Sequence, residues 1–267
     1  MNKPIGSYFW TTLFTSMALL MYEVALTRIF SVIMNYHFVF VVISFALLGL
    51  GVGAMVEGLY FRDALRHSGA RLWLLIAGAI SLPISGLLLV SLPLTAGVNF
   101  GHPWFYVYLG IATLPFMFGG MNFAWIFQSG TEKSAILYAG DLLGAAVGGV
   151  GAWLLLNHVS GLGAVMGSGL LAGVGAFAFS RLRRNAKTRG VGVVVITGLL
   201  FAGSFLSIYP EVPIGQDPDK DLYRIGQGGY KPEIIDSRWS AFGRTDLVRT
   251  PHSPHELSLY VDGAAGT

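Results

Sequence analysis

Long, uninterrupted apolar runs constrain this chain more than any other feature of its sequence. Several exceed the roughly 20 residues that a helix needs to cross a hydrocarbon layer about 30 Å thick. Backbone groups find no water inside that layer, so only helices and closed barrels span it, and continuous runs favour helices over barrel strands. The sequence therefore predicts an all-α polytopic membrane bundle of about seven transmembrane helices, followed by a small C-terminal β-hairpin segment.

Charge content supports the same fold class. Of the 267 residues, 54% are hydrophobic and 12% are charged, and the mean hydropathy is +0.63. A soluble domain carries roughly 25% charged residues, so this chain has too little charge to cover a water-facing surface. We expect the lipid bilayer to be its main partner, and no nucleic acid. The chain contains no cysteine, which excludes disulfides and thiolate metal sites, and the sequence identifies no cofactor.

Loops punctuate the apolar runs and divide the chain into two parts. A transmembrane domain over residues 1–209 precedes a soluble tail over residues 210–267. The predicted spans are residues 7–30, 37–60, 72–93, 104–127, 135–157, 160–180 and 190–209.

Orientation is predicted from the positions of Lys and Arg. They concentrate at the N-terminus and in the loops after the second and sixth spans, and they are absent from the loops after the third and fifth. Basic loops stay in the cytoplasm. The chain is therefore expected to be a multi-pass membrane protein with these basic loops in the cytoplasm, and an odd number of spans places its tail outside the cytoplasm.

Glycines recur at four-residue spacing inside the predicted spans. Such groups are Gly49 and Gly53; Gly140, Gly144 and Gly148; and Gly169 and Gly173. Small residues at this spacing allow two helix backbones to approach closely. We expect tight helix packing at these positions, with a glycine-lined passage for a small molecule as the alternative.

Charged residues within spans are costly, by about 2.5–3.5 kcal/mol at the middle of a helix, so each needs a reason. Glu23 and Arg28 fall in the first span and Asp141 in the fifth. Helical spacing places Glu23 with Thr27 on a polar seam that also includes Thr12 and Ser16, and it turns both acids into the bundle. Arg28 lies five residues after Glu23, off the ideal spacing, but its long side chain can reach a carboxylate or pair with a neighbouring helix. We interpret Glu23, Arg28, Asp141, Thr27 and Tyr138 as an intramembrane polar network, which either fixes helix register or forms a binding site or proton relay.

Three histidines are expected on the outer face. His37 begins the second span, His102 precedes the fourth, and His158 lies between the fifth and sixth. Imidazoles that meet there are candidate ligands for a metal or a haem. They have no metal-ligand spacing, so the alternative is three interfacial side chains without a special role.

The tail has a different character. It is rich in proline and charge, and after a linker it contains two strand-like stretches, at residues 234–248 and 257–261, joined by a loop over 250–256. Two strands are seldom stable alone in water. We therefore expect the tail to pack against the membrane domain, an additional protein domain or another subunit.

Several segments resemble bacterial membrane-fused spermidine-synthase-like (polyamine aminopropyltransferase-like) proteins. They are residues 22–31 (YEVALTRIFS), 36–38 (YHF), 47–51 (LLGLG), 137–145 (LYAGDLLGA), 239–246 (WSAFGRTD) and 260–263 (YVDG). The resemblance implies that the tail is the hairpin entry to a soluble Rossmann-like domain that binds S-adenosyl compounds. The Gly-rich loop of that domain is not within these residues, so this chain alone is not expected to catalyse aminopropyl transfer. S-adenosyl chemistry is cytoplasmic, whereas the charge rule places the tail outside.

Three functional hypotheses follow. The first is the membrane module of a spermidine-synthase-like protein, which anchors or positions a soluble S-adenosyl-binding-type domain. The second is a non-enzymatic subunit of a larger membrane complex. The third is a small transporter that uses Glu23, Arg28 and Asp141.

Overall fold

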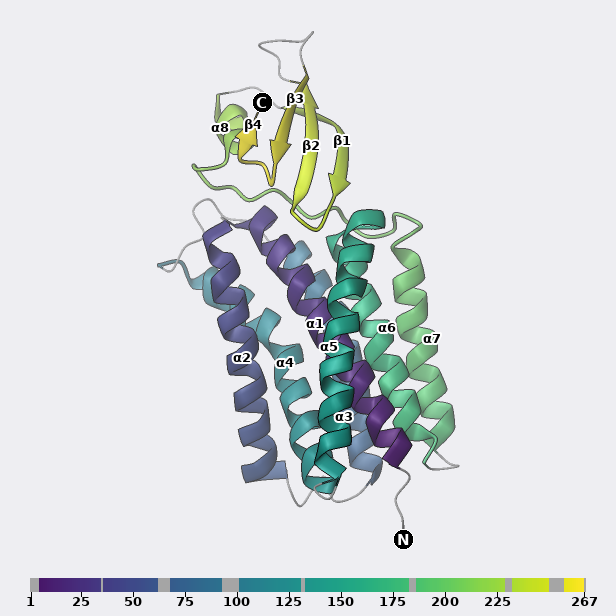
Figure 1. Cartoon of the computed structure of the whole chain (residues 1–267). Coiled ribbons are helices and arrows are strands. Elements are labelled where there is room, and N and C mark those ends of the chain that lie inside the picture. The colour runs from purple at the N-terminus through teal and green to yellow at the C-terminus, as the bar shows by residue number, and fades with distance from the viewer. Residues whose placement is uncertain are drawn as a thin grey trace.

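A bundle of long helices, capped at one end by a small β-sheet, forms the molecule (Figure 1). The computed structural model describes residues 5–34, 36–61, 68–92, 101–130, 133–182, 186–228, 232–249 and 257–266. Within them the long helices are α1 (Ile5–Ile33), α2 (Val39–Val56), α3 (Ser68–Ser91), α4 (Pro103–Ser129), α5 (Ser134–His158), α6 (Gly161–Ser180) and α7 (Lys187–Gly203). A 3-10 turn, η1 (Tyr36–Phe38), precedes α2, and a π-helical turn, η2 (Glu57–Phe61), follows it.

Among the residues that the structure describes, six helical segments, those of α1 to α6, are long and apolar enough to cross a membrane. This confirms the predicted multi-pass helical bundle, but not its count of seven spans. The seventh predicted span, residues 190–209, corresponds to α7, which has 17 residues and is shorter than each of the six. It ends early because the chain folds back after Gly203, where the Tyr209 hydroxyl donates to the carbonyl oxygen of Leu200 at 2.6 Å. Helix α7 nevertheless lies alongside α6 and α3 (Figure 1).

Helix α1 is the centre of the bundle, and α5 and α6 pack along it. Glycine makes the closest of these contacts possible, because a Cβ atom at Gly144 or Gly148 of α5 would overlap the backbone carbonyl oxygen of Leu13 or Met17 on α1. Glycine allows the same close approach between α2 and α4, at Gly53 and Gly120. The predicted role of the four-residue glycine spacing in tight packing is confirmed at these contacts.

The helices run alternately up and down, so the N-terminus and the sheet lie at opposite ends of the bundle (Figure 1). Most basic residues of the helical part that the structure describes lie at the end away from the sheet, where α3, α5 and α7 begin and α6 ends. They are Arg71, Lys133, Arg181, Lys187 and Arg189. Arg28, near the end of α1, is the exception and lies at the sheet end.

The tail folds into a short helix, α8 (Asp221–Gln227), and an antiparallel sheet of order β1-β2-β3-β4. Its strands are β1 (Glu233–Trp239), β2 (Arg244–Arg249), β3 (Leu257–Val261) and the two-residue β4 (Ala265–Gly266). Strand β3 has the predicted bounds. The other predicted stretch, 234–248, is wrong as one strand, because it turns at Ser240, whose N–H donates to the carbonyl oxygen of Gly243 at 2.9 Å. The predicted loop over 250–256 lies outside the described residues.

Candidate functional site: the junction between the bundle and the tail

Lys220 joins the tail to the end of α1. The last carbonyl groups of a helix have no partners within that helix. The Lys220 ammonium donates to the carbonyl oxygens of Ser31 at 2.9 Å and Val32 at 2.8 Å, and also to that of Asp262 at 2.6 Å. All three ammonium protons therefore have acceptors. One side chain of the tail caps the central helix of the bundle and holds the β3–β4 turn against it.

Burial defines the electrostatics of this contact. Lys220 is 1% exposed, and loss of hydration lowers the pKa of its ammonium to about 8, although nearby carboxylates, Asp262 foremost, act in the opposite direction. At neutral pH the group still carries its charge. A positive charge at a helix C-terminus interacts favourably with the helix dipole.

Two more contacts fix the same corner. The Ser31 hydroxyl donates to Asp262 Oδ2 at 2.6 Å, and the Gly215 N–H donates to the carbonyl oxygen of Val32 at 2.9 Å. Gly215 has no room for a side chain, since a Cβ atom there would overlap the Ile33 carbonyl oxygen. Asp262 also accepts the Arg244 N–H through Oδ1, at 2.8 Å. The linker, the sheet and α1 therefore meet in one hydrogen-bonded corner.

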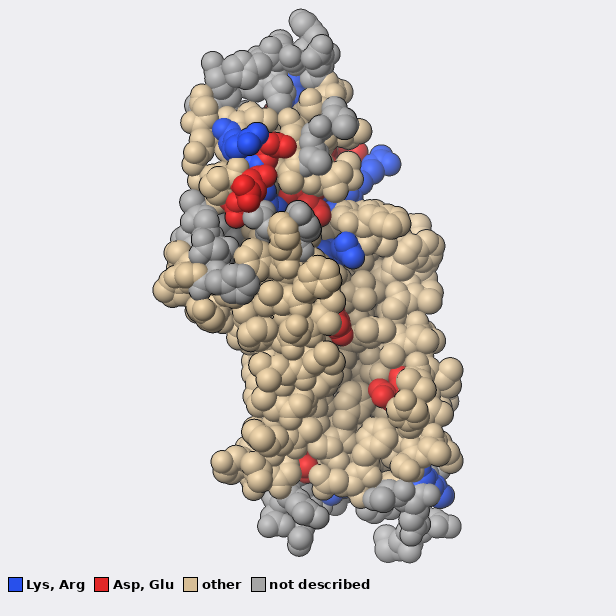
Figure 2. Space-filling model, turned by 60° about the vertical axis from the view of Figure 1, so that its left-hand side comes forward, with Lys and Arg blue, Asp and Glu red and all other residues tan. Residues whose placement is uncertain are grey.

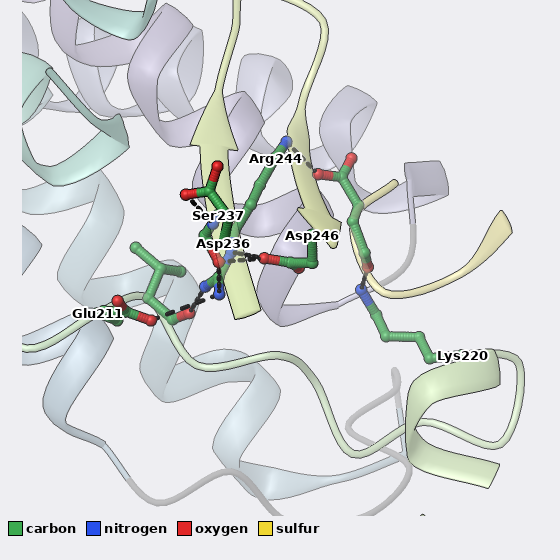
Figure 3. Close-up of polar contacts among 8 residues, drawn as sticks. Glu211, Lys220, Asp236, Ser237, Arg244 and Asp246 are labelled. Carbon is green, nitrogen blue, oxygen red and sulfur yellow. Dashed lines mark hydrogen bonds and ion pairs between the residues drawn. The ribbon is translucent and has the colours of Figure 1, made fainter. Parts of the chain in front are cut away.

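A second buried cation, Arg244, holds the strands to the linker (Figure 3). Its side chain is 3% exposed. Its Nε donates to Asp246 Oδ1 at 2.7 Å and its Nη1 to the Val212 carbonyl oxygen at 2.6 Å. The Ser237 hydroxyl of β1 donates to the same Asp246 oxygen at 2.5 Å and accepts from Arg244 Nη2 at 3.0 Å. Buried charges need this degree of pairing, and here the pairing makes the linker and two strands a single unit.

Arg28 belongs to the junction and not to a pair with Glu23. Its Nη1 donates to the carbonyl oxygen of Phe242, in the turn between β1 and β2, at 3.0 Å. Neither predicted alternative, a carboxylate or a neighbouring helix, is the partner in this hydrogen bond, because the side chain extends from the end of α1 toward the tail. Beside it, Trp239 of β1 lies close to Gly161 at the start of α6.

The structure brings together only part of the predicted polar network. Glu23 and Asp141 line a common cavity of about 310 Å³, which Ser16 also lines. Thr27 instead donates to the carbonyl oxygen of Val24 in its own helix, at 2.7 Å. Tyr138 is 56% exposed on the outside of the bundle.

The three predicted metal or haem candidates stay apart. His37 lies in η1, His102 precedes α4 and accepts the Trp104 N–H through Nδ1 at 3.3 Å, and His158 is in the last turn of α5. All three are at the end of the bundle that carries the tail. Within the described residues, no three His, Asp or Glu side chains gather as a metal site.

Sequence reasoning missed Lys220 and Arg244, the two buried cations of the tail. Both lie in stretches that are polar enough to resemble exposed linker or strand surface, and their partners are far away in sequence. Glu57, which follows the last residue of α2, is 2% exposed and accepts a hydrogen bond from Gln128 Nε2 at 2.9 Å.

No protein-family model, no curated protein and no solved structure matches the chain. The junction and the surfaces around it are therefore the features that indicate a function for the chain.

Proposed function

We propose that this chain is the membrane module of a spermidine-synthase-like protein, which holds a soluble synthase-like domain in a fixed orientation at the membrane surface. The observation that carries the proposal is the attachment of the tail sheet to α1 through Lys220. A sheet on a free linker would position nothing. This sheet shares hydrogen bonds with the central helix of the bundle, so a domain built on the sheet would take its orientation from the membrane part.

The sheet has a surface on which such a domain can pack. Its inner face, with Val248 and Tyr260, covers Leu222 of α8. Its outer face exposes Leu257, Leu259 and Val261 of β3, which are between 45% and 49% exposed.

Charged residues of β1 and β2 lie on the same face of the sheet, on one side of this apolar strip. They are Glu233, Asp236, Arg238 and Arg249, which are linked by exposed ion pairs from Arg249 to Glu233 and from Arg238 to Asp236. An apolar centre with a polar rim is the usual composition of a protein interface. The outer face therefore supports a protein partner on the tail.

Site-specific cross-linking tests the proposal. A photo-reactive phenylalanine derivative at Leu259 of the protein in its native membrane is expected to capture a peptide from a synthase-like domain, identified by mass spectrometry. The same group at Trp153, exposed on the helical part, is the control for random capture. Lipid adducts alone at both positions would refute the proposal.

The mass of the cross-linked species separates the first two functional hypotheses. Capture within one polypeptide heavier than 28.7 kDa supports a domain continuous with the tail. Capture between two polypeptides supports a separate subunit of a larger complex.

We propose further that the protein lies in a bacterial inner membrane with its tail outside the cytoplasm, on the evidence of the basic residues at the opposite end of the bundle. The chain has no cysteine, so single substitutions report sidedness directly. Asp219→Cys is expected to react with a membrane-impermeant maleimide on intact cells, and Lys187→Cys only after lysis. The reverse pattern would place the tail in the cytoplasm, where S-adenosyl compounds are available.

A further inference from the structure

A groove opens on the side of the bundle between α2 and α5. Helix α2 packs mainly on α4, and α5 mainly on α1, so α1 and α4 form the floor between them. The cavity in this groove has a volume of about 310 Å³. Its lining is largely apolar and includes Leu20, Leu50, Phe116 and Phe123.

Two carboxylates interrupt this apolar lining, Glu23 from α1 and Asp141 from α5. Figure 2 shows acidic groups as isolated spots on an otherwise uncharged side of the bundle. Glu23 lies ten residues before the end of α1 and Asp141 seven residues after the start of α5. At 1.5 Å per residue these are depths of about 15 Å and 10 Å from the helix ends. Both acids therefore lie in the part of the bundle that faces hydrocarbon.

Neither carboxylate has a partner of opposite charge among the described residues. Across the part of the chain that the structure describes, no Lys, Arg or His forms an ion pair or hydrogen bond with the side chain of Glu23 or Asp141. The Ser16 hydroxyl in the same groove donates to the backbone carbonyl oxygen of Asp141, at 2.9 Å, and not to its carboxylate. Glu57 differs, because it is buried and has Gln128 as a partner. An acid in a membrane span that lacks an internal partner points to an external one.

We propose that this groove binds hydrophobic cations, that is, ligands with one positive charge on an apolar body that enter sideways from the bilayer. The two carboxylates complement the charge, and the leucine and phenylalanine walls complement the body. The aromatic ring of Phe123, which is partly exposed, also attracts cations. A small divalent cation fits less well, because Ca²⁺ and Mg²⁺ need six or more oxygen ligands and the walls here are apolar.

Binding of tetraphenylphosphonium to the purified protein in lipid nanodiscs tests the proposal, with tetraphenylborate as a probe of closely similar shape and opposite charge. Saturable binding of the cation and not of the anion is expected. Glu23→Gln and Asp141→Asn should each weaken cation binding at least tenfold, and Glu57→Gln should leave it unchanged. Equal binding of the cation by the wild type and the Glu23→Gln/Asp141→Asn double variant would overturn the proposal.

A variant that keeps both acids guards against loss of binding through misfolding. Ala54 of α2 lines the groove and is partly exposed. Ala54→Phe fills the groove from its α2 wall, and its folding is checked by the melting temperature in the same nanodiscs. Cation binding at least tenfold weaker than that of the wild type is expected. Unchanged binding by a folded Ala54→Phe protein would show that the cation sits elsewhere and would refute the site.

Discussion

Lys220→Met tests the attachment of the tail to the bundle most directly. Methionine keeps the length and apolar stem of the side chain but removes its donors, so the carbonyl oxygens of Ser31, Val32 and Asp262 lose a common partner. Hydrogen bonds from a charged group contribute roughly 1.5–3 kcal/mol each. Three bonds at about 2 kcal/mol give about 6 kcal/mol before the cost of burying the charge.

The pKa of Lys220 gives a lower bound on that burial cost, because its fall from 10.5 to about 8 remains after nearby carboxylates have offset part of the desolvation. The fall corresponds to about 3 kcal/mol, at 1.36 kcal/mol for each unit. With this value the net loss in Lys220→Met is about 3 kcal/mol, which is roughly a 100-fold decrease in the ratio of docked to undocked tail.

Hydrogen exchange measured by mass spectrometry on the protein in detergent reports this ratio. The peptide around Gly215 is informative, because the Gly215 N–H donates to α1 at the junction. Its protection should fall roughly 100-fold in Lys220→Met, while peptides from the middle of α1 keep theirs. The control is Arg224→Met, which removes an exposed ion pair with Asp221 worth less than about 1 kcal/mol. Equal protection around Gly215 in the wild type and Lys220→Met would refute the capping argument.

Three further predictions follow from the same geometry. The pKa of Lys220 is lower in the folded protein than in the unfolded chain, so the unfolded chain binds more protons between about pH 8 and 10.5. The stability of the docked tail should therefore rise by about 2 kcal/mol from pH 7.5 to 9.5. Hydrogen exchange corrected to each pH measures this rise, and Lys220→Met should lose it. Gly53→Ala should destabilise the bundle by about 1–3 kcal/mol in thermal unfolding, because the added Cβ would overlap a backbone carbonyl of α4. Gly51→Ala on the same helix is the control, because its Cβ meets open space. Equal melting temperatures for the two variants would contradict the packing role of Gly53. Arg244→Met should lower the stability of the sheet by about 3–5 kcal/mol, because it leaves the Asp246 carboxylate buried and uncompensated. The double variant Arg244→Met/Asp246→Leu should recover much of that stability, measured as hydrogen-exchange protection of the β2 amides. No recovery would show that the two residues act independently.

The helical part was predictable because each long helix coincides with a long apolar run. Helix α5 covers Ser134–His158 against a predicted 135–157, and its glycines contact α1 as their spacing indicates. The end of α7 was not predictable in this way. Residues as far as Ile208 remain apolar, and only the bond from Tyr209 back to Leu200 shows where the helix stops. Apolarity locates a segment in the membrane, whereas a helix end depends on local hydrogen bonds.

The junction was beyond sequence reasoning for a different reason. Lys220 stands among Asp217, Asp219 and Asp221, a pattern typical of an exposed linker. Its decisive partners lie 188 and 189 residues earlier in the chain, and no local period indicates a contact of that range. The turn inside residues 234–248 was missed because Trp239 and Phe242 make the stretch apolar enough to resemble one continuous strand.

The sequence shows which acids lie within the spans, but not what surrounds their side chains. Helical spacing predicts that Glu23 and Asp141 both point into the bundle, whereas both line a groove that is open on its side. The spacing cannot show that α2 and α5 leave a gap there, because the gap depends on which helices pack together. The groove is therefore a property of the assembled bundle.

The bond between Lys220 and the end of α1 has a consequence for biogenesis. Ser31 leaves the ribosome before α2 to α7 are made, and Lys220 emerges only after them. A single missing crossing among these helices would leave Lys220 on the opposite side of the membrane from Ser31. The contact between them therefore forms only in a chain whose intervening helices return it to the side where α1 ends.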